Sequence, residues 1–364
     1  MREMSARSAG GDADLRRLRL RSLFASLIFT TVAFLVYRYS PHTLRLRGPA
    51  RGAIPFSAEQ FLVCAYWFYI MAIVAHSRWA ASAEPSRALL AIRALRQFAR
   101  SPVAVARHGL PDAERLGLLV TLLKMFFAPL MLLSLHSAVT IVLNNGVGLA
   151  HLEPSSAREW FHAFNAYGFT FLYQLILLVD VGFFTFGYLV EHSSLRNKIR
   201  SVDATLVGWI ATIACYPPFN GITVKILGGN VNDFPQFDHP IFHLLVNGLI
   251  LALMLVYASA SVALKWKASN LTHRGIVASG PYRYVRHPAY MTKNCAWWLA
   301  TLPALSVAAT QSWGAVFLIV GSSAGWAAIY VLRALTEEDH LRSVDEDYDR
   351  YCDVVRYRFI PGIY

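Results

Sequence analysis

Apolar segments long enough to cross a lipid bilayer recur along this chain. A membrane-spanning helix needs about 20 largely apolar residues, and eight segments approach that length: residues 22–39, 58–77, 116–143, 160–190, 203–216, 241–264, 290–309 and 312–332. Because backbone groups in hydrocarbon must be hydrogen-bonded internally, we expect an all-α polytopic membrane helix bundle with about eight transmembrane segments. The segment 203–216 is short and could be re-entrant, and the hairpin around Pro303 could be two full spans or two short ones.

The composition supports the same class. Hydrophobic side chains make up 55% of the 364 residues and charged side chains only 15%, a balance too apolar for an ordinary water-soluble domain. The formal charge of +12 does not by itself indicate nucleic acid, because Lys and Arg in a membrane protein are first distributed between the two sides of the bilayer. The cysteines have neither paired nor metal-ligand spacing, so we expect no disulfide framework and no metal site: Cys64, Cys215, Cys295 and Cys352.

The basic residues predict the orientation of the spans. If the N-terminus lies in the cytoplasm, 27 Lys and Arg residues fall on the cytoplasmic side and five on the other, while Arg38 and Lys124 lie within spans. This bias favours eight spans with both termini in the cytoplasm. A cleavable signal peptide is the competing interpretation of the first apolar run. That run continues to Tyr37 without an Ala-x-Ala-like cleavage site, so we expect a retained helix.

A basic segment follows the second span. Residues 86–107 carry apolar side chains among Arg87, Arg93, Arg96 and Arg100. The pattern is typical of an amphipathic helix that lies on an anionic membrane surface. We therefore expect the bilayer, and no nucleic acid, as the partner of this segment.

Two polar clusters flank the last hydrophobic hairpin. The first is the sequence GPYRYVRHPAY from Gly280 to Tyr290, in which Pro288 suits the first position of a helix. Arg286 and His287 would then lie at a helix N-terminus, and this end together with the cations Arg283 and Arg286 would favour a carboxylate or phosphate. The alternative is that these cations are interfacial residues that extend toward the headgroups.

The second cluster, RALTEEDHL, starts at Arg333 and is expected to open an amphipathic C-terminal helix. Arg333 and Glu337 are four residues apart, so a salt bridge would explain that pair. It would not explain why Glu337 and Glu338 both lie where the hairpin returns to the side of the first cluster. Because the two ends of the hairpin share one side, we expect both clusters to form one cytoplasmic pocket.

Several motifs in this region occur together in a fixed order. An Arg-His-Pro-x-Tyr segment is followed by the apolar hairpin, a Glu-Glu-x-x-Leu block, and then by Tyr348, Tyr351 and the closing Arg358-Phe359-Ile360-Pro361. In this order and spacing, residues 240–364 resemble the isoprenylcysteine carboxyl methyltransferase and phospholipid methyltransferase family of integral membrane enzymes. The resemblance implies an enzyme that binds S-adenosylmethionine at the cytoplasmic surface. Its methyl acceptor, lipidic or prenylated, would enter from the bilayer.

The resemblance also implies a set of site residues. Acidic side chains can bind ribose hydroxyls or an amino group, Arg can bind a carboxylate, and aromatic rings can face a sulfonium. We expect cofactor contacts from Tyr284, His287, Pro288, Tyr290, Arg333, Glu337 and Glu338. We expect catalytic roles for His287, Glu338 and Arg286, with His287 or Glu338 as proton acceptor if the methyl acceptor is an amine or a hydroxyl.

Two features keep other functions open. The family often has Gly two residues after the Tyr, where this chain has Met291-Thr292, and the chain ending is also similar to that of membrane sterol reductases, which use NADPH. An NADPH-dependent reductase of an isoprenoid or sterol-like double bond is therefore the alternative. A non-catalytic lipid-binding or transport protein is the third possibility.

Asp180 lies in an apolar run, where an unpaired charge would be costly. It could line the acceptor cavity and bind substrate, or simply bond to a neighbouring helix. The chain as a whole divides into three regions. Residues 1–115 hold the N-terminal tail, two spans and the basic segment, 116–240 are a central transmembrane region, and 241–364 form the methyltransferase-like module.

Overall fold

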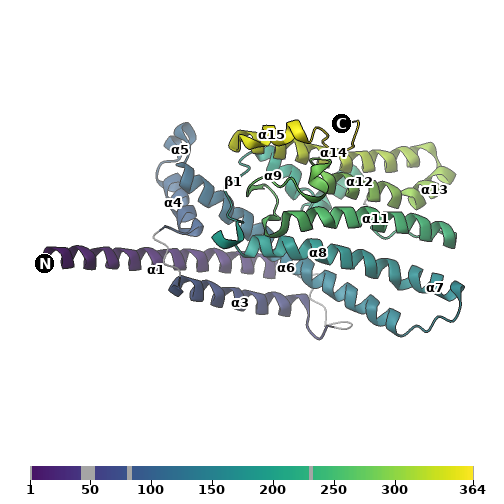
Figure 1. Ribbon diagram of the computed structural model, residues 1–364, viewed down its shortest axis with the longest axis horizontal. Helices are drawn as coiled ribbons and strands as arrows, with labels where there is room; N and C mark the ends of the chain where they lie inside the picture. Colours follow the sequence, from purple (N-terminus) through teal and green to yellow (C-terminus); the bar gives the residue numbers. More distant parts are fainter. Residues whose placement is uncertain (1, 42–53, 80–83, 229–232, 364) are drawn as a thin grey trace. The chain divides into compact units, whose positions relative to one another are not determined.

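The structure, a computed structural model, describes residues 2–41, 54–79, 84–228 and 233–363. The described residues are helical apart from loops and one small sheet (Figure 1). Among the described residues, six helical segments are long and apolar enough to cross a membrane: Ala13–Tyr39, Ala58–Trp79, Asp112–Ala150, Ala157–Leu189, Pro240–Lys267 and Trp313–Val344. The expected class, an all-α multi-pass membrane protein, is thereby confirmed.

The chain forms two compact units. One comprises Met1–Pro49 and Phe56–Leu133, and the other Ala50–Pro55 and Ser134–Tyr364. Helix α6 (Asp112–Ala150) contributes its first part to unit 1 and its second part to unit 2. A single continuous helix therefore carries the chain from one unit into the next.

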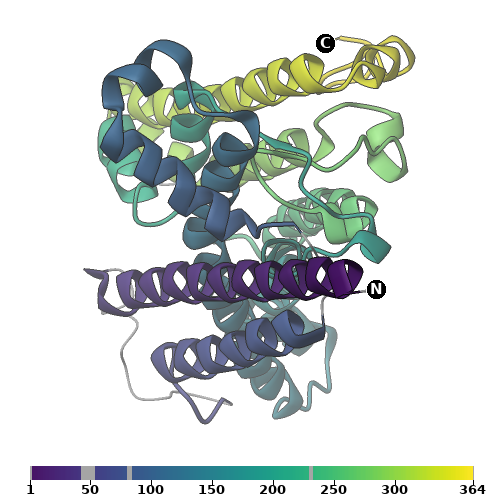
Figure 2. The same ribbon diagram turned by 90° about the vertical axis from the view of Figure 1, so that its left-hand side faces the viewer.

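Unit 1 is built around two adjacent helices. Helices α1 (Arg2–Tyr39) and α3 (Ala58–Trp79) lie side by side (Figure 2), and the rings of Phe34 and Tyr66 stack between them with centroids 4.2 Å apart. Helices α4 (Arg87–Arg100) and α5 (Pro102–His108) follow, and Ser86 caps α4 by accepting a hydrogen bond from the backbone N–H of Leu89.

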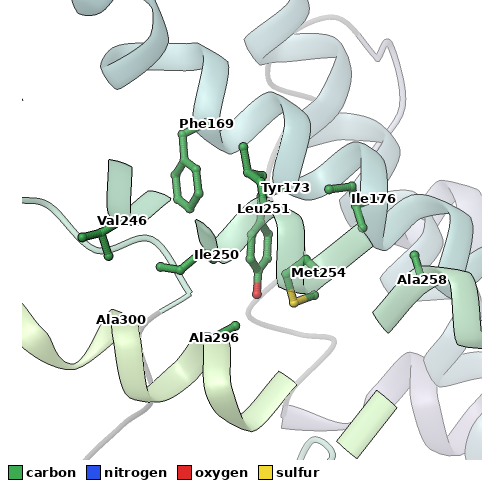
Figure 3. Packing of buried hydrophobic residues seen from close by; sticks show 10 residues of the cluster. All are labelled: Phe169, Tyr173, Ile176, Val246, Ile250, Leu251, Met254, Ala258, Ala296 and Ala300. Carbon is green, nitrogen blue, oxygen red and sulfur yellow. The ribbon is translucent and has the colours of Figure 1, made fainter. Parts of the chain in front are cut away.

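In unit 2, helix α7 (Ala157–Ala163) continues through a π-helical turn, Phe164–Gly168, into α8 (Phe169–Leu189). Helix α8 packs along α11 (Pro240–Leu264), which is followed by a short 3₁₀ turn, Lys265–Lys267. Figure 3 shows the core between them. Its residues come from α8, α11 and the facing α12 (Pro288–Ala300): Phe169, Tyr173, Ile176, Val246, Ile250, Leu251, Met254, Ala258, Ala296 and Ala300.

A two-stranded antiparallel sheet joins the ends of these two helices. Strand β1 (Ser201–Val202) follows α8 and a 3₁₀ turn, Ser193–Leu195, and pairs with β2 (Thr272–His273), which follows α11. Helices α8 and α11 therefore run parallel, with their C-terminal ends together. The chain between them must travel back along the bundle, and the described residues of this part form two short α-helices, α9 (Leu206–Ile213) and α10 (Asn220–Leu227).

The C-terminal part of unit 2 begins with a 3₁₀ turn, Gly280–Arg283, and then α12 (Pro288–Ala300). It continues through α13 (Leu302–Gln311), α14 (Trp313–Val344) and α15 (Asp347–Val354). Two expected spans, 203–216 and 290–309, thus correspond to shorter helices. An eight-residue helix such as α9 rises only about 12 Å, against about 30 Å of hydrocarbon. Within the described residues, the length criterion is therefore met by six helices, and the expected count of eight is not confirmed.

Helix α8 approaches the segment after α11 closely at Gly187, and a substitution at this glycine tests that contact. A Cβ atom at Gly187 would lie 2.1 Å from the carbonyl oxygen of Ala268, whereas one at Gly182 would meet no atom within 4 Å. We expect Gly187→Ala to lower the free energy of unfolding by about 1–3 kcal/mol through overpacking. Gly182→Ala should be neutral or slightly stabilising, because Ala is the better helix former.

Thermal unfolding of both variants in one detergent measures this difference. Equal unfolding temperatures for Gly187→Ala and the unmodified protein would contradict the close contact.

Candidate functional site

The first polar cluster leads into α12 as expected. His287 occupies the N-cap and Pro288 is the first helical residue, so the predicted helix start is confirmed. The preceding backbone is held by the C-terminal tail, because the N–H of Arg286 donates to the Tyr357 carbonyl and that of His287 to the Arg358 carbonyl, both at 2.9 Å. The end of the chain is thus a structural part of this site.

The second polar cluster forms the last turns of α14 instead of opening a new helix. This long helix continues to Val344, and the separate α15 follows it. Tyr348 of α15 is buried, and the hydroxyl of Tyr351 donates to the Tyr282 carbonyl at 2.7 Å. The buried ring of Tyr348 packs α15 against the protein, and the hydrogen bond of Tyr351 holds α15 beside the first cluster.

A fully buried carboxylate, that of Glu338, joins the two clusters. Arg358 donates to both oxygens, from Nε to Oε1 and from Nη2 to Oε2 at 2.9 Å each. Arg286 Nε donates to Oε1 at 2.9 Å, and Arg342 Nη2 to Oε2 at 3.3 Å. His287 Nε2 lies 3.1 Å from Oε1. Three guanidinium groups and an imidazole therefore surround one carboxylate, so none of the predicted catalytic residues Glu338, Arg286 and His287 is free of a protein partner.

The imidazole of His287 is itself enclosed. Its ring stacks on that of Tyr290, with centroids 5.4 Å apart and planes at 10°, and it also contacts Phe359 of the tail. Its Nδ1 lies 4.0 Å from Oε2 of Glu337, which accepts a hydrogen bond from the Tyr290 hydroxyl at 2.9 Å. Unlike Glu338, Glu337 keeps 46% of its side chain exposed.

A polar cavity lies on the other side of Tyr290. Its wall combines α12 and α14 with residues near β1, α9 and β2: Asp203, Thr212, Leu271, Thr272, Tyr290, Arg333, Thr336, Glu337, His340 and Leu341. Its volume of about 20 Å³ accommodates about one water molecule. Three of the predicted cofactor-binding residues, Tyr290, Arg333 and Glu337, therefore converge on one cavity.

Arg333 is the buried cation of this cavity. Its Nη2 donates to Oδ1 of Asn270 at 2.9 Å, and its guanidinium carbon lies 4.9 Å and 5.1 Å from the ring centroids of Tyr290 and Tyr330. Its Nε is buried without a hydrogen-bond acceptor. A donor in this state favours an anionic or carbonyl oxygen as its partner. The spacing of Arg333 and Glu337 would allow a salt bridge, but among the described residues the acceptor bonded to Arg333 is Asn270 and not Glu337.

Sequence reasoning missed the wall contributed by the segment around β1. Asp203 is 2% exposed, and its Oδ1 accepts from the Thr205 N–H at 2.8 Å, while its Oδ2 is buried without a donor. His340 Nε2 lies 3.0 Å from Oγ of Ser201. The only sequence signal was the position of Asp203 at the edge of a short apolar segment, which does not by itself indicate a site.

The remaining predicted residues lie outside the cavity wall. Tyr284 is 58% exposed and contacts Arg283, and Pro288 is buried at the start of α12. Asp180 of α8 is buried and accepts hydrogen bonds from the hydroxyls of Tyr257, at 2.8 Å, and Ser261, both on α11. These two bonds match the expectation that Asp180 bonds to a neighbouring helix.

The family comparison covers the same part of the chain. Residues 236–355 match a family model described as a protein of unknown function, DUF1295. No curated protein and no solved structure matches the chain. The matched segment runs from just before α11 to the end of α15 and includes both polar clusters. Within the described residues, no three His, Cys, Asp or Glu side chains are grouped in a way that could hold a metal ion.

Neutralising Glu338 tests its role in joining the clusters. Glu338→Gln leaves Arg286, Arg358 and Arg342 without their common counter-ion. Removing one partner of a buried ion pair costs about 3–5 kcal/mol, so we expect a large loss in the free energy of unfolding. Glu337→Gln, at the half-exposed neighbouring position, should cost less than about 1 kcal/mol. Thermal and denaturant unfolding of the two variants distinguish them, and equal losses would contradict the assignment.

A buried histidine beside the site makes stability depend on pH. His273 Nε2 in β2 lies 2.9 Å from Oδ2 of Asp345, with Arg200 4.0 Å from the same oxygen. Burial lowers the pKa of His273 below 6.5, and Asp345 opposes this shift only in part. Below that pH the unfolded chain binds a proton that the native state does not, so stability must fall on acidification.

We expect the unfolding temperature to decrease as the pH falls below about 6.5. The slope should be smaller in His273→Gln than in the unmodified protein. Scanning calorimetry across this range checks the prediction, and an identical slope in both proteins would assign the pH dependence to other groups.

Proposed function

We propose that this protein is an integral membrane methyltransferase that moves a methyl group from S-adenosylmethionine to a lipidic or prenylated acceptor. The observation that carries the proposal is the cavity wall formed by Tyr290, Arg333 and Glu337. The family resemblance implies cofactor contacts for all three residues, which come from two clusters separated by a hairpin. Their convergence supports a common ligand.

The polar groups of the cavity fit those of S-adenosylmethionine. The free Nε donor of Arg333 suits a carboxylate, and the free Oδ2 acceptor of Asp203 suits an amino group or a ribose hydroxyl. Glu337 offers a second, half-exposed acceptor.

The chemistry supplied by bound S-adenosylmethionine is an electrophilic methyl group. The protein's residues would contribute chiefly position, because displacement at a methyl carbon needs in-line alignment. Glu338, Arg286 and His287 would keep α12, α14 and the tail at fixed spacing through their mutual bonds. An acceptor that loses a proton would need a base, and Glu337 and His340 line the cavity, whereas Glu338 does not.

Binding on this proposal requires the cavity to widen, because its volume of about 20 Å³ is far smaller than a nucleoside. Leu271 and Thr272, at the start of β2, line the cavity together with residues of the last turns of α14. Separation of this segment from α14 would open it. The side chain of Glu337, being half exposed, marks the side from which the cofactor would enter.

We also propose that eight segments cross the membrane, two of them as broken helices. The parallel course of α8 and α11 supports this, because the chain with α9 and α10 must return across the bundle between them. Helices α12 and α13 together would make the other broken crossing. The Lys and Arg distribution then favours a cytoplasmic location for both clusters and both termini.

Calorimetric titration of the purified protein with S-adenosylmethionine and its demethylated product tests the cofactor. We expect binding that is weakened roughly tenfold or more in Glu337→Gln, the cost of losing a charge-assisted hydrogen bond. Glu346→Gln, an exposed acid two residues beyond the end of α14, is the matched control and should bind as the unmodified protein does.

Other outcomes would redirect the proposal. Binding of NADPH without S-adenosylmethionine would favour the reductase suggested by the chain ending. Binding of lipid with neither cofactor would favour a lipid-binding or transport protein.

A further inference from the structure

An exposed amphipathic segment in unit 1 has no part in the proposed cofactor site. The N-terminal half of α4 is packed against the unit, with Leu89, Leu90, Ala91 and Ala94 each at most 6% exposed. From Leu95 onward every residue of α4 is exposed, as is most of α5. The described residues of the chain therefore leave the second half of this segment uncovered.

The start of α4 contacts α1 and α6. Both contacts lie where the sequence of the neighbouring helix changes from charged to apolar residues. The N–H of Ser86 donates to Oγ of Ser22 at 3.1 Å, and Ser22 follows the last arginine before the apolar run of α1. Leu90 packs on Gly117 of α6, where a Cβ atom would lie 2.4 Å from the Cβ of Leu90. Gly117 is near the start of the apolar run of α6. These two attachments place the start of α4 at the boundary between the hydrocarbon and the headgroups.

The exposed half of α4 has two chemically distinct faces. At about 100° per residue, Arg93, Arg96 and Arg100 share one face, and Leu95 and Phe98 lie on the opposite one. The apolar side chains are far from buried, at 48% for Leu95 and 57% for Phe98. An apolar face that is exposed beside the membrane boundary is the pattern of a helix lying in the interface.

The charge around this segment is strongly positive. Residues 84–115 contain six arginines against three acidic residues, Glu84, Asp112 and Glu114. In the adjacent part of α1, the side chains of Arg16, Arg17 and Arg21 are exposed as well. Such a concentration of guanidinium groups at headgroup depth complements the phosphates of anionic lipids.

We propose that α4 and α5, with the arginines of α1, form a binding site for the headgroups of anionic phospholipids. Leu95 and Phe98 would insert among the upper acyl carbons while Arg93, Arg96 and Arg100 contact the phosphates. A nucleic acid would use the same arginines, but it offers no partner for the apolar face. The inference is independent of the cofactor and of the acceptor.

The test uses the full-length protein purified in a neutral detergent. Fluorescent phosphatidylglycerol and phosphatidylcholine are titrated against the unmodified protein and the triple variant Arg93→Gln/Arg96→Gln/Arg100→Gln. We expect phosphatidylglycerol to bind more tightly to the unmodified protein. Each arginine near an anionic surface contributes roughly a fivefold factor, so the triple variant should lose tenfold or more of that preference.

Two controls keep the result interpretable. Arg158→Gln/Arg350→Gln removes exposed arginines outside the segment and should leave the preference unchanged. Leu95→Ser/Phe98→Ser should weaken the binding of both lipids, and unchanged circular dichroism excludes unfolding. A preference for phosphatidylglycerol that survives in the triple variant would overturn the proposal. Selective binding of an RNA oligomer by the same arginines, without lipid selectivity, would overturn it equally.

Discussion

The carboxylate of Glu338 is the interaction on which the C-terminal half of unit 2 depends. It is completely buried, so its charge is tolerated only because Arg286, Arg342, Arg358 and His287 supply donors to its two oxygens. These partners come from the start of α12, the end of α14 and the C-terminal tail. One acidic side chain therefore fixes three segments that are far apart in sequence at the mouth of the hairpin.

A second constraint comes from the parallel packing of α8 and α11. Parallel neighbours need a connection that returns along the bundle, and in this chain the connection consists of short helices and loops. Non-helical backbone at membrane depth is tolerated where protein covers it or where it lines a cavity. The start of this connection, with Asp203 and Thr212, does line the polar cavity. The connection made of short helices and the cavity thus have one structural origin.

The parts of this structure that could be predicted from sequence are those determined locally. Apolar length predicted the long helices, and the missing N–H of Pro288 predicted the start of α12. The sequence also predicted that the two polar clusters lie close together, because they flank a hairpin whose two ends are on the same side. The contribution of Asp203 could not be predicted, because it depends on the pairing of β1 with β2, which are separated by α9, α10 and α11. Strands of two residues are too short to show an alternation of apolar and polar side chains. The division of α6 between the two units depends on tertiary contacts, because the helix is apolar on both sides of the division.

The adjacent acids Glu337 and Glu338 show why a motif identifies a site more readily than it assigns roles. Consecutive residues of a helix point about 100° apart, so the two carboxylates must face different surroundings. Glu338 faces the arginines and is buried, whereas Glu337 faces Tyr290 and the cavity and stays half exposed. The first is suited to hold the walls together and the second to contact a ligand. His287 bonds Glu338 and stacks on Tyr290, whose hydroxyl bonds Glu337. His287 therefore joins the cavity wall to the buried ion cluster, and through that cluster to the tail.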